Sequence, residues 1–476
     1  MEHFIGILLV LLVVAAIWML VRAARFRPPE RIEKPDAEPR VDRDRAVEHL
    51  REMIRCRTIS SPELRREEEF ERFRNLLPEF YPTLWKIAAV ERVDTTGVLI
   101  RVPGREPGNP AVMLSHYDVV PAQEAVWEKP PFDGVLEDGV LWGRGTLDMK
   151  NQLCAMLEAA ETLLEDGFRP RHDLYFALSG EEEIMGPSAP AMRDLFVERG
   201  ITPAFVLDEG GDIMDGFFPG TEVPCAMVGI GEKGVANLYF TARSTGGHAS
   251  VPYPNNPLPR LCRAMSRIGR HPFPMRTAPA LEAMVDTMGR YCDFRTRLLL
   301  ANRKLLRPLY FRWLRKQGGM LEAAACTTFA LTQCSGAQAG NVIPAEASMF
   351  ANLRLLWGDT QESVKARLQK RIRDPQVELR LNPGTDPGPE SLLGPEFDRL
   401  KAAIEATWPQ AVVSPYQMVA CTDSRHWRSI CDHVYRFSGK YVTGEEKSTV
   451  HGNNERIRTE NTENAVKFFI RLMREC

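Results

Sequence analysis

One stretch, residues 111–150, constrains the fold of this chain more strongly than any other. It opens with the letters AVMLSHYDVVP and closes with LWGRGTLDMK. Residues 111–114 form a short apolar run that is typical of a buried strand, and residues two apart on a strand point to the same face. His116 and Asp118 should therefore project together, as a metal-ligating histidine does with the carboxylate that accepts its other ring N–H. The ordinary alternative is a histidine paired with an aspartate in a solvated turn, so the rest of the chain must decide.

Strands and helices alternate after this stretch. A stripe of apolar residues at helical spacing covers 149–166, which places Asp148 at a helix N-terminus. The apolar strand 174–179 leads into three glutamates at 181–183, and the strand 204–207 leads into Asp208. This order predicts an α/β fold with a largely parallel central sheet.

Acidic side chains and a histidine thus follow the carboxyl ends of several strands, where ligands collect in open α/β sheets. Carboxylates gathered in one cleft repel one another unless cations neutralise them. Histidine with carboxylates is a ligand set that suits zinc or a similar divalent metal, and two metals suit the number of ligands better than one.

Composition excludes other classes of protein. The chain has 476 residues, enough for two or three domains, and an ordinary apolar fraction of 44%. Its 61 basic and 63 acidic residues give a net charge of -2, so there is no basic footprint for nucleic acid, and we expect a peptide or small-molecule substrate. The 10 cysteines are scattered without a C-x-x-C pair, which argues against a thiolate zinc site or a disulfide framework.

The N-terminus carries the one segment that is not typical of a globular domain. Residues 4–21 contain no charge and are about long enough to span a bilayer, so we expect a single transmembrane anchor. A cleavable signal peptide is the alternative, but no basic residue precedes the apolar run. Arg22, Arg25 and Arg27 follow it, which favours a cytoplasmic enzyme without fixing the side of the membrane. Residues 22–44 are rich in proline and charge and suit a tether.

Seven motifs occur in one order along the remaining chain: SHYDVVP, GRGTLDMK, GEEEIMG, VLDEGG, GGHASVP, NVIP and VHGNNE. Together they resemble the dizinc metallopeptidase family of carboxypeptidase G, aminoacylase and succinyl-diaminopimelate desuccinylase. Within that family they are most similar to the branch of carboxypeptidase S and the secreted N-fatty-acyl amino acid synthase/hydrolase. The resemblance runs from about Arg45 to the C-terminus.

The resemblance implies a zinc-peptidase catalytic domain made of residues 45–228 and 389–476. Residues 229–388 would form an inserted α+β lid, commonly the dimerisation domain, so a homodimer through the lid is expected. In the lid the patterns predict strands near 235–243, 329–333, 348–356 and 377–381, with helices at 257–270 and 360–373.

The resemblance also implies the metal site, with two zinc ions per subunit and Co²⁺ or Mn²⁺ as substitutes. Carried over to this chain, the metal ligands are His116, the bridging Asp148, Glu183, Asp208 and His451. Asp118 would orient His116, and Glu182 would be the general base. Because Glu181 stands where relatives often have aspartate, Glu182 and Glu183 exchange roles if the register shifts.

Further family positions would contact the substrate. His248 would stabilise the oxyanion and is often presented from the partner subunit, while a solvated loop histidine is the alternative. Asn341 and Arg354 would line the substrate end of the cleft, where a guanidinium clamps a carboxylate with two hydrogen bonds. Arg425 is a second candidate for that contact, with a surface salt bridge as the alternative.

One segment departs from a plain lid. Residues 295–316 interleave arginines with leucines and aromatic residues, a pattern typical of a basic amphipathic helix, here interrupted at Pro308. Packing against the lid is the ordinary explanation. Contact with the membrane surface or with a lipidic acyl chain is the sharper hypothesis, because an anchor is expected in the same chain.

The sequence therefore predicts a membrane-anchored zinc hydrolase that cleaves an amide beside a free carboxylate. The substrate is either a C-terminal peptide bond, as for a carboxypeptidase, or an N-acyl amino acid, and N-fatty-acyl amino acid hydrolysis or synthesis is the related alternative. Two other classes stay open: a catalytically silent relative that binds peptides, and a phosphoesterase with two metals.

Overall fold

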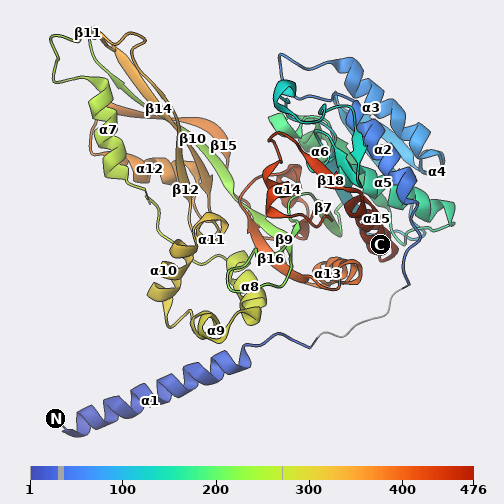
Figure 1. Ribbon diagram of the computed structural model, residues 1–476, viewed down its shortest axis with the longest axis horizontal. Coiled ribbons are helices and arrows are strands. Elements are labelled where there is room, and N and C mark those ends of the chain that lie inside the picture. Colours follow the sequence, from blue (N-terminus) through green and yellow to red (C-terminus); the bar gives the residue numbers. More distant parts are fainter. Residues whose placement is uncertain (1, 31–36, 271) are drawn as a thin grey trace.

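The computed structural model describes residues 2–30, 37–270 and 272–476. Two bodies, each built on its own sheet, lie side by side in Figure 1, and the first helix, α1, projects from below them. The larger sheet has nine strands in the described part of the chain. They are β1 (Ala89–Val93), β2 (Gly97–Val102), β3 (Ala111–His116), β6 (Leu174–Ser179), β7 (Phe205–Asp208), β8 (Ile213–Met214), β9 (Cys225–Glu232), β16 (Val412–Met418) and β17 (Val434–Arg436).

The central strands of this sheet are mainly parallel. The order is β1-β2-β6-β3-β7-β17-β9-β16, with β8 on β9. The neighbours β6/β3, β3/β7, β7/β17 and β9/β16 run parallel, whereas β1/β2, β2/β6, β17/β9 and β8/β9 are antiparallel. Since β6, β3 and β7 are parallel neighbours, their carboxyl ends meet at one edge. The predicted α/β class is therefore confirmed, with a mixed rather than purely parallel sheet.

Helices cover both faces of the larger sheet. On β3, Met113 packs in the layer of α5 and α15, and Val112 packs in the opposite layer with α6 and the 3₁₀ segment η4. Both side chains are fully buried, and each such burial contributes about 1.5–3 kcal/mol. The elements around the sheet are α2 (Arg43–Arg55), α3 (Glu67–Phe80), α4 (Pro82–Ile87), α5 (Lys150–Glu165), α6 (Ser188–Glu198), α13 (Pro395–Thr407), η4 (Asp423–Ser429), α14 (Gly444–Ser448) and α15 (Thr459–Arg474).

A small antiparallel sheet holds the loop before α5 against the chain's C-terminal part. Its order is β18-β5-β4, with bounds Arg456–Arg458, Val140–Trp142 and Val135–Glu137. Residues on either side of this sheet, at 144–148 and 451–455, are thereby brought together although three hundred positions separate them in sequence.

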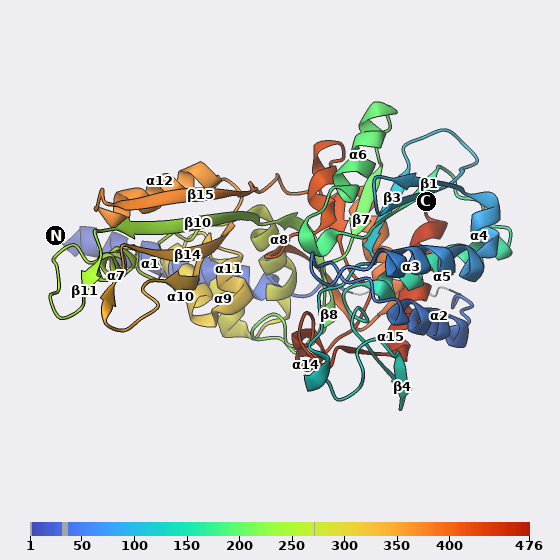
Figure 2. The same ribbon diagram turned by 90° about the horizontal axis from the view of Figure 1, so that it is seen from above.

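The second body is a separate four-stranded antiparallel sheet of order β12-β14-β10-β15. Its strands are Thr328–Ser335, Glu346–Leu355, Gly234–Arg243 and Val377–Thr385, and its helices are α7 (Pro257–Ile268) and α12 (Gln361–Ile372). All four strands and both helices expected in the lid are therefore present. Figure 2 shows the two-stranded ribbon of β11 (Gly247–His248) and β13 (Val342–Ile343) at the end of this body away from the larger sheet.

Residues between α7 and β12 form a cluster of helices, α8 (Pro279–Met288), α9 (Phe294–Ala301), α10 (Arg307–Gln317) and α11 (Gly319–Ala323), which we call the helical insert. The segment 295–316, expected as a helix interrupted at Pro308, forms two helices, and the break between them comes before Pro308. Pro308 lies in the first turn of α10 instead of interrupting a helix, a position where its missing N–H costs nothing. The insert packs on β9 and β16 of the larger body through Met227 and Tyr416.

At the N-terminus, α1 (Glu2–Arg25) is long and apolar enough to cross a membrane, and its best stretch of 18 residues has a mean hydropathy of 3.1. The same description fits a signal sequence as well as an anchor. Residues 31–36 of the expected tether lie outside the described residues.

Candidate active site

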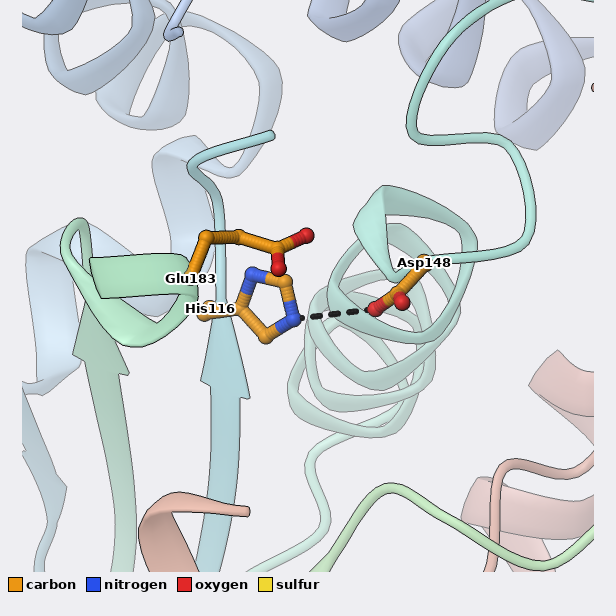
Figure 3. Close-up of side chains that lie close together, drawn as sticks. All are labelled: His116, Asp148 and Glu183. Atoms are coloured by element: carbon orange, nitrogen blue, oxygen red, sulfur yellow. Dashed lines mark hydrogen bonds and ion pairs between the residues drawn. The ribbon is translucent and has the colours of Figure 1, made fainter. Parts of the chain in front are cut away.

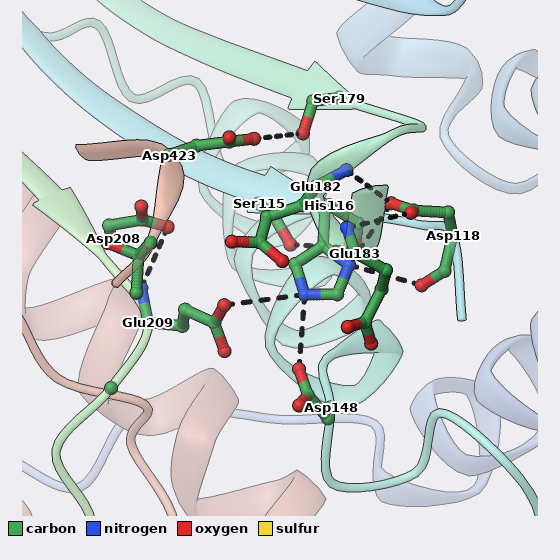
Figure 4. A network of polar contacts seen from close by, with 12 residues as sticks. Ser115, His116, Asp118, Asp148, Ser179, Glu182, Glu183, Asp208, Glu209 and Asp423 are labelled. Carbon is green, nitrogen blue, oxygen red and sulfur yellow. Dashed lines mark hydrogen bonds and ion pairs between the residues drawn. The ribbon is translucent and has the colours of Figure 1, made fainter. Parts of the chain in front are cut away.

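The expected site residues converge at the carboxyl edge of the larger sheet. His116 is the last residue of β3, Asp208 ends β7, and Glu182 and Glu183 form a short 3₁₀ turn three residues beyond β6. Asp148 lies just before α5. Figure 4 shows these side chains pointing toward one another from separate strands and loops.

His116 is the buried centre of the cluster, with only 2% of its surface exposed. Its Nδ1 lies 3.1 Å from the carbonyl oxygen of Asp118 and 3.3 Å from that residue's Oδ1. Its Nε2 lies 3.1 Å from Asp148 Oδ1, as Figure 3 shows, and 3.4 Å from Glu209 Oε1. One ring nitrogen is thus held from behind while the other faces carboxylates, which is the arrangement of a metal-ligating histidine.

His451 approaches the same carboxylates from the opposite end of the chain. Its Nε2 lies 3.1 Å from Asp148 Oδ2 and 3.1 Å from Glu183 Oε1. Asp148 therefore contacts His116 through one oxygen and His451 through the other.

At the end of β7, two neighbouring carboxylates differ in what they face. The oxygens of Asp208 accept hydrogen bonds from the backbone N–H groups of Glu209 and Ser424, both at 2.8 Å. Glu209, which the sequence analysis did not select, directs its carboxylate at His116. Among the described residues, ligand atoms within 4.8 Å of one another occur in two groups, His116 with Asp148 and Glu183, and His116 with Glu182 and Glu209.

The acidic side chains of the cluster differ in how tightly they hold protons. Burial opposes ionisation of Asp148, yet its hydrogen bonds with His116 and His451 lower its pKa well below the ordinary value. Burial raises the pKa of Glu182 well above its ordinary value, and it raises the pKa of Asp208 to about 6 and that of Glu209 to about 7. Burial opposes protonation of His116, yet Asp118, Asp148 and Glu209 together raise its pKa well above 6.5. So many carboxylates around two histidines fit divalent cations, because only added positive charge relieves their mutual repulsion.

Asp118 connects the histidine to the glutamate turn. It is fully buried, and its carboxylate accepts hydrogen bonds from the backbone N–H groups of Glu182 at 3.1 Å and Glu183 at 3.2 Å, and from Ser60 Oγ at 2.6 Å. One side chain thus positions both His116 and the two glutamates.

Glu455 holds the backbone around Asp148 in place, as Asp118 does for the two glutamates. The sequence analysis did not single it out. It is fully buried and accepts hydrogen bonds from the backbone N–H groups of Leu147 at 2.7 Å and Asp148 at 3.2 Å. It also pairs with buried Arg144 at 2.7 Å. Its position in the VHGNNE motif, four residues after His451, was the available signal.

The residues expected to contact substrate are divided between two places. Arg425 Nη1 lies 3.8 Å from Glu182 Oε1, and Arg354 Nη1 lies 4.0 Å from Cys421 Sγ. Arg425 thus belongs to the segment 421–425 beside the cluster, and Arg354 contacts that segment. His248 and Asn341 are exposed on the β11–β13 ribbon and are not brought to the cluster within this chain (Figure 1). There His248 Nδ1 lies 2.7 Å from Ser250 Oγ.

Residues 112–475 match the model of peptidase family M20/M25/M40. The N-fatty-acyl-amino acid synthase/hydrolase PM20D1 of Bos taurus is 34% identical over 433 residues, covering 88% of this chain and 86% of the relative. The "Probable carboxypeptidase S-like 2" of Dictyostelium discoideum is 31% identical over 415 residues, covering 86% of this chain and 80% of the relative.

Solved structures show the same fold at low identity. The M20 family metallo-carboxypeptidase Sso-CP2 of Sulfolobus solfataricus superposes with a TM-score of 0.67 at 16% identity, over 90% of this chain and 98% of that structure. YXEP of Bacillus subtilis is described as a dinuclear metal binding peptidase from the M20 family. It superposes with a TM-score of 0.56 at 13% identity, over 90% of this chain and 97% of that structure. The sequence match and the shared fold agree with the expectation drawn from the motifs: this chain is a metallo-hydrolase that belongs to peptidase family M20/M25/M40.

Proposed function

We propose that this chain hydrolyses an amide bond next to a free carboxylate, in an N-acyl amino acid or at the C-terminus of a peptide. The observation that carries the proposal is the position of Arg425, whose guanidinium lies 3.8 Å from Glu182 at the edge of the cluster. A cationic group beside the reacting centre suits a substrate whose carboxylate is adjacent to the scissile bond.

In this proposal His116, Asp148, Glu183 and His451 hold two divalent metal ions, zinc in the first place. Asp208 or Glu209 supplies the remaining carboxylate: the family resemblance favours the first, and the distance to His116 favours the second. Metal ions in such a site supply a water acidic enough to attack an amide at neutral pH.

The chain's own groups then move the protons and hold the substrate. Glu182 accepts the proton of the attacking water and returns it to the leaving amine, a function that suits its raised pKa and buried position. Asp118 keeps Glu182 and Glu183 in place through their backbone N–H groups. Arg425 and Arg354 hold the substrate carboxylate from the side of segment 421–425.

The remaining substrate contacts come from a second copy of the chain. His248 and Asn341 are exposed at the far end of the lid (Figure 1), so a partner's lid is needed to bring them to this site. Mixing His248→Ala protein with Glu182→Gln protein tests this: activity should return in the mixture, because one mixed site carries both native residues. A mixture as inactive as its components would contradict the sharing of sites.

For the N-terminus we propose that α1 is an uncleaved, single-pass anchor. Within the helix His3–Arg25 the best stretch of 18 residues has a mean hydropathy of 3.1, and the side chains at 4–14 are exposed in the isolated chain. The arginines at 22, 25 and 27 favour a cytoplasmic catalytic domain.

A hydrolysis panel tests the proposed function. Zinc-loaded protein is offered dipeptides, N-acetyl amino acids and N-fatty-acyl amino acids, together with the corresponding amides that lack the free carboxylate, and Glu182→Gln serves as the matched control. We expect cleavage only by the parent protein and only of substrates with the free carboxylate.

The same panel separates the rival functions. Preference for peptides indicates a carboxypeptidase, and preference for long acyl groups indicates the N-fatty-acyl amino acid chemistry named for the PM20D1 relative. Metal binding without cleavage of any amide would favour another substrate class, tested first with phosphate esters. Absence of metal binding would favour a silent peptide-binding relative.

A further inference from the structure

The helical insert, residues 279–323, has an apolar core of its own that is fixed to the larger body. Leu281, Val285, Leu300 and Leu314 are fully buried and pack with strands β9 and β16. The insert therefore packs on the larger body and not on the sheet of the lid, which was the ordinary expectation. The remaining question is what the other side of the insert contacts.

The C-terminal third of α1 packs directly on this insert. Ala15, Met19, Ala23 and Phe26, spaced four, four and three apart, lie on one side of the helix and are half-buried or buried, whereas the residues before them are exposed. The contact is to α9, and directly after that helix the buried side chain of Asn302 donates a hydrogen bond from Nδ2 to the carbonyl oxygen of Met19 at 3.1 Å.

Phe26, just beyond α1, is part of the apolar cluster of the insert. The guanidinium of Arg290 lies 4.9 Å from the centre of its ring and donates a hydrogen bond to the carbonyl oxygen of Arg27 at 3.2 Å. One of the contacting residues, Met19, belongs to the apolar run itself. If that run lies in a bilayer, the insert is therefore held at the bilayer surface and not at the end of a long tether.

The exposed side of the insert combines apolar and basic side chains. Phe294, Leu305 and Leu309 are 44%, 58% and 56% exposed. Between Gly289 and Met320 the sequence has nine basic residues and one acidic residue, Asp293, whose carboxylate caps α9.

The basic residues of the insert are not equivalent. Arg303 is buried and paired with Glu282 at 2.7 Å and Asp286 at 3.0 Å, so it holds the insert together. Lys304, Arg307 and Arg312 are exposed and next to the exposed leucines in sequence. This set of side chains has the composition of surfaces that bind the headgroup region of anionic membranes.

We propose that the helical insert is a membrane-binding surface for anionic phospholipid, held against the bilayer by its contact with α1. The exposed leucines enter the boundary between headgroups and acyl chains, and Lys304, Arg307 and Arg312 contact lipid phosphates. The inference goes beyond the proposed hydrolase function and rests on the proposal that α1 is retained. It predicts that the mature protein still contains Met19 to Phe26, because these residues complete the packing of the insert.

The test uses the full-length protein reconstituted into nanodiscs of phosphatidylcholine, with or without phosphatidylglycerol. A photoreactive p-benzoylphenylalanine replaces Leu305 or Leu309, and the same group at Val197 is the matched control. Val197 is 55% exposed on α6, which lies at the other side of the molecule from α1 in Figure 1. We expect phospholipid adducts by mass spectrometry at 305 and 309 and none at 197.

A variant without the exposed basic side chains tests how much of the lipid binding depends on their charge. Replacing Lys304, Arg307 and Arg312 by glutamine should reduce the adduct yield in phosphatidylglycerol discs to that in phosphatidylcholine alone. Equal yields at 309 and 197, an absence of adducts at both insert positions, or a mature N-terminus beyond Phe26 would each overturn the proposal. Hydrolysis of a soluble N-acetyl amino acid, measured on the same samples, reports separately on the proposed activity and confirms that the variants are folded.

Discussion

Replacement of Asp118 by asparagine tests the structural logic of the site most directly. The carboxylate is fully buried and receives three hydrogen bonds, from the backbone N–H groups of Glu182 and Glu183 and from Ser60 Oγ. Its Oδ1 also lies 3.3 Å from His116 Nδ1. Asparagine has nearly the same shape but only one acceptor oxygen, so the change removes acceptors without creating a cavity.

The magnitude follows from the geometry. Oδ1 serves Glu182 N–H and His116, and Oδ2 serves Glu183 N–H and Ser60, so the amide NH₂ group must face one of these two pairs of donors. Toward Ser60 the NH₂ group donates to the hydroxyl, which turns to accept, so only Glu183 N–H is left without an acceptor. One buried donor without an acceptor costs about 1–3 kcal/mol, which is the predicted loss in the free energy of unfolding. Loss of the carboxylate behind a metal-ligating histidine lowers metal affinity or activity by about 10- to 100-fold.

Three measurements separate these effects. Urea unfolding of the metal-free protein gives the change in stability, a competition titration with a chelator gives metal affinity, and hydrolysis at saturating metal gives the change in kcat. Ser60→Ala is the matched control, because it removes one donor to Asp118 and should cost only about 0.5–1.5 kcal/mol. If Asp118→Asn keeps the parent stability, metal affinity and kcat, Asp118 does not organise the site and the reasoning is refuted.

The remaining predictions concern other parts of the chain. Glu455→Gln breaks a buried pair with Arg144 and should lower the free energy of unfolding by about 3–5 kcal/mol, and weaken metal binding through the loop at Asp148; unchanged metal affinity would argue against that coupling. Glu390 has its pKa raised from 4.5 to about 7 by burial, so its ionisation destabilises the fold as the pH rises from 4.5 to 7. Glu390→Gln should therefore raise Tm relative to the parent above pH 7 and have little effect near pH 4.5, and a pH-independent difference would count against this cause. Metal removal should lower stability by about 2.7 kcal/mol relative to protein at a free metal concentration of a hundred times Kd, seen as a Tm that depends on metal concentration.

The strands and helices that carry the site follow from the sequence because each has a simple pattern. A strand such as β3 is apolar along its whole length, since both of its faces are covered, and the apolar stripe of α5 has helical spacing. The convergence of His116, Glu183 and Asp208 then follows from the parallel order of their strands. The structure brings these residues together, and the metal-binding functions assigned to them remain proposals.

The orientation of individual carboxylates does not follow from such patterns. Asp208 and Glu209 are neighbours at the end of one strand, and which of them faces His116 depends on the backbone N–H of Ser424, from a segment over two hundred residues later. Glu455 is a similar case, because its function appears only when β18 pairs with β5 and brings the two loops together. Local periodicity contains no information about such distant partners.

For the surfaces of the helical insert, too, the sequence pattern does not reveal the contact partner. The pattern over 295–316 specified an apolar side and a basic side but not the partner of either. The apolar side packs on β16 of the larger body, and α9 also receives the end of α1 from nearly three hundred residues earlier. Because α1 reaches α9 at Met19, within its apolar run, the position of the insert relative to that run is determined by tertiary contact, which the amphipathic pattern alone cannot supply. A candidate partner for the exposed leucines and basic residues of the insert, the anionic phospholipid proposed above, can therefore be inferred only from the folded chain.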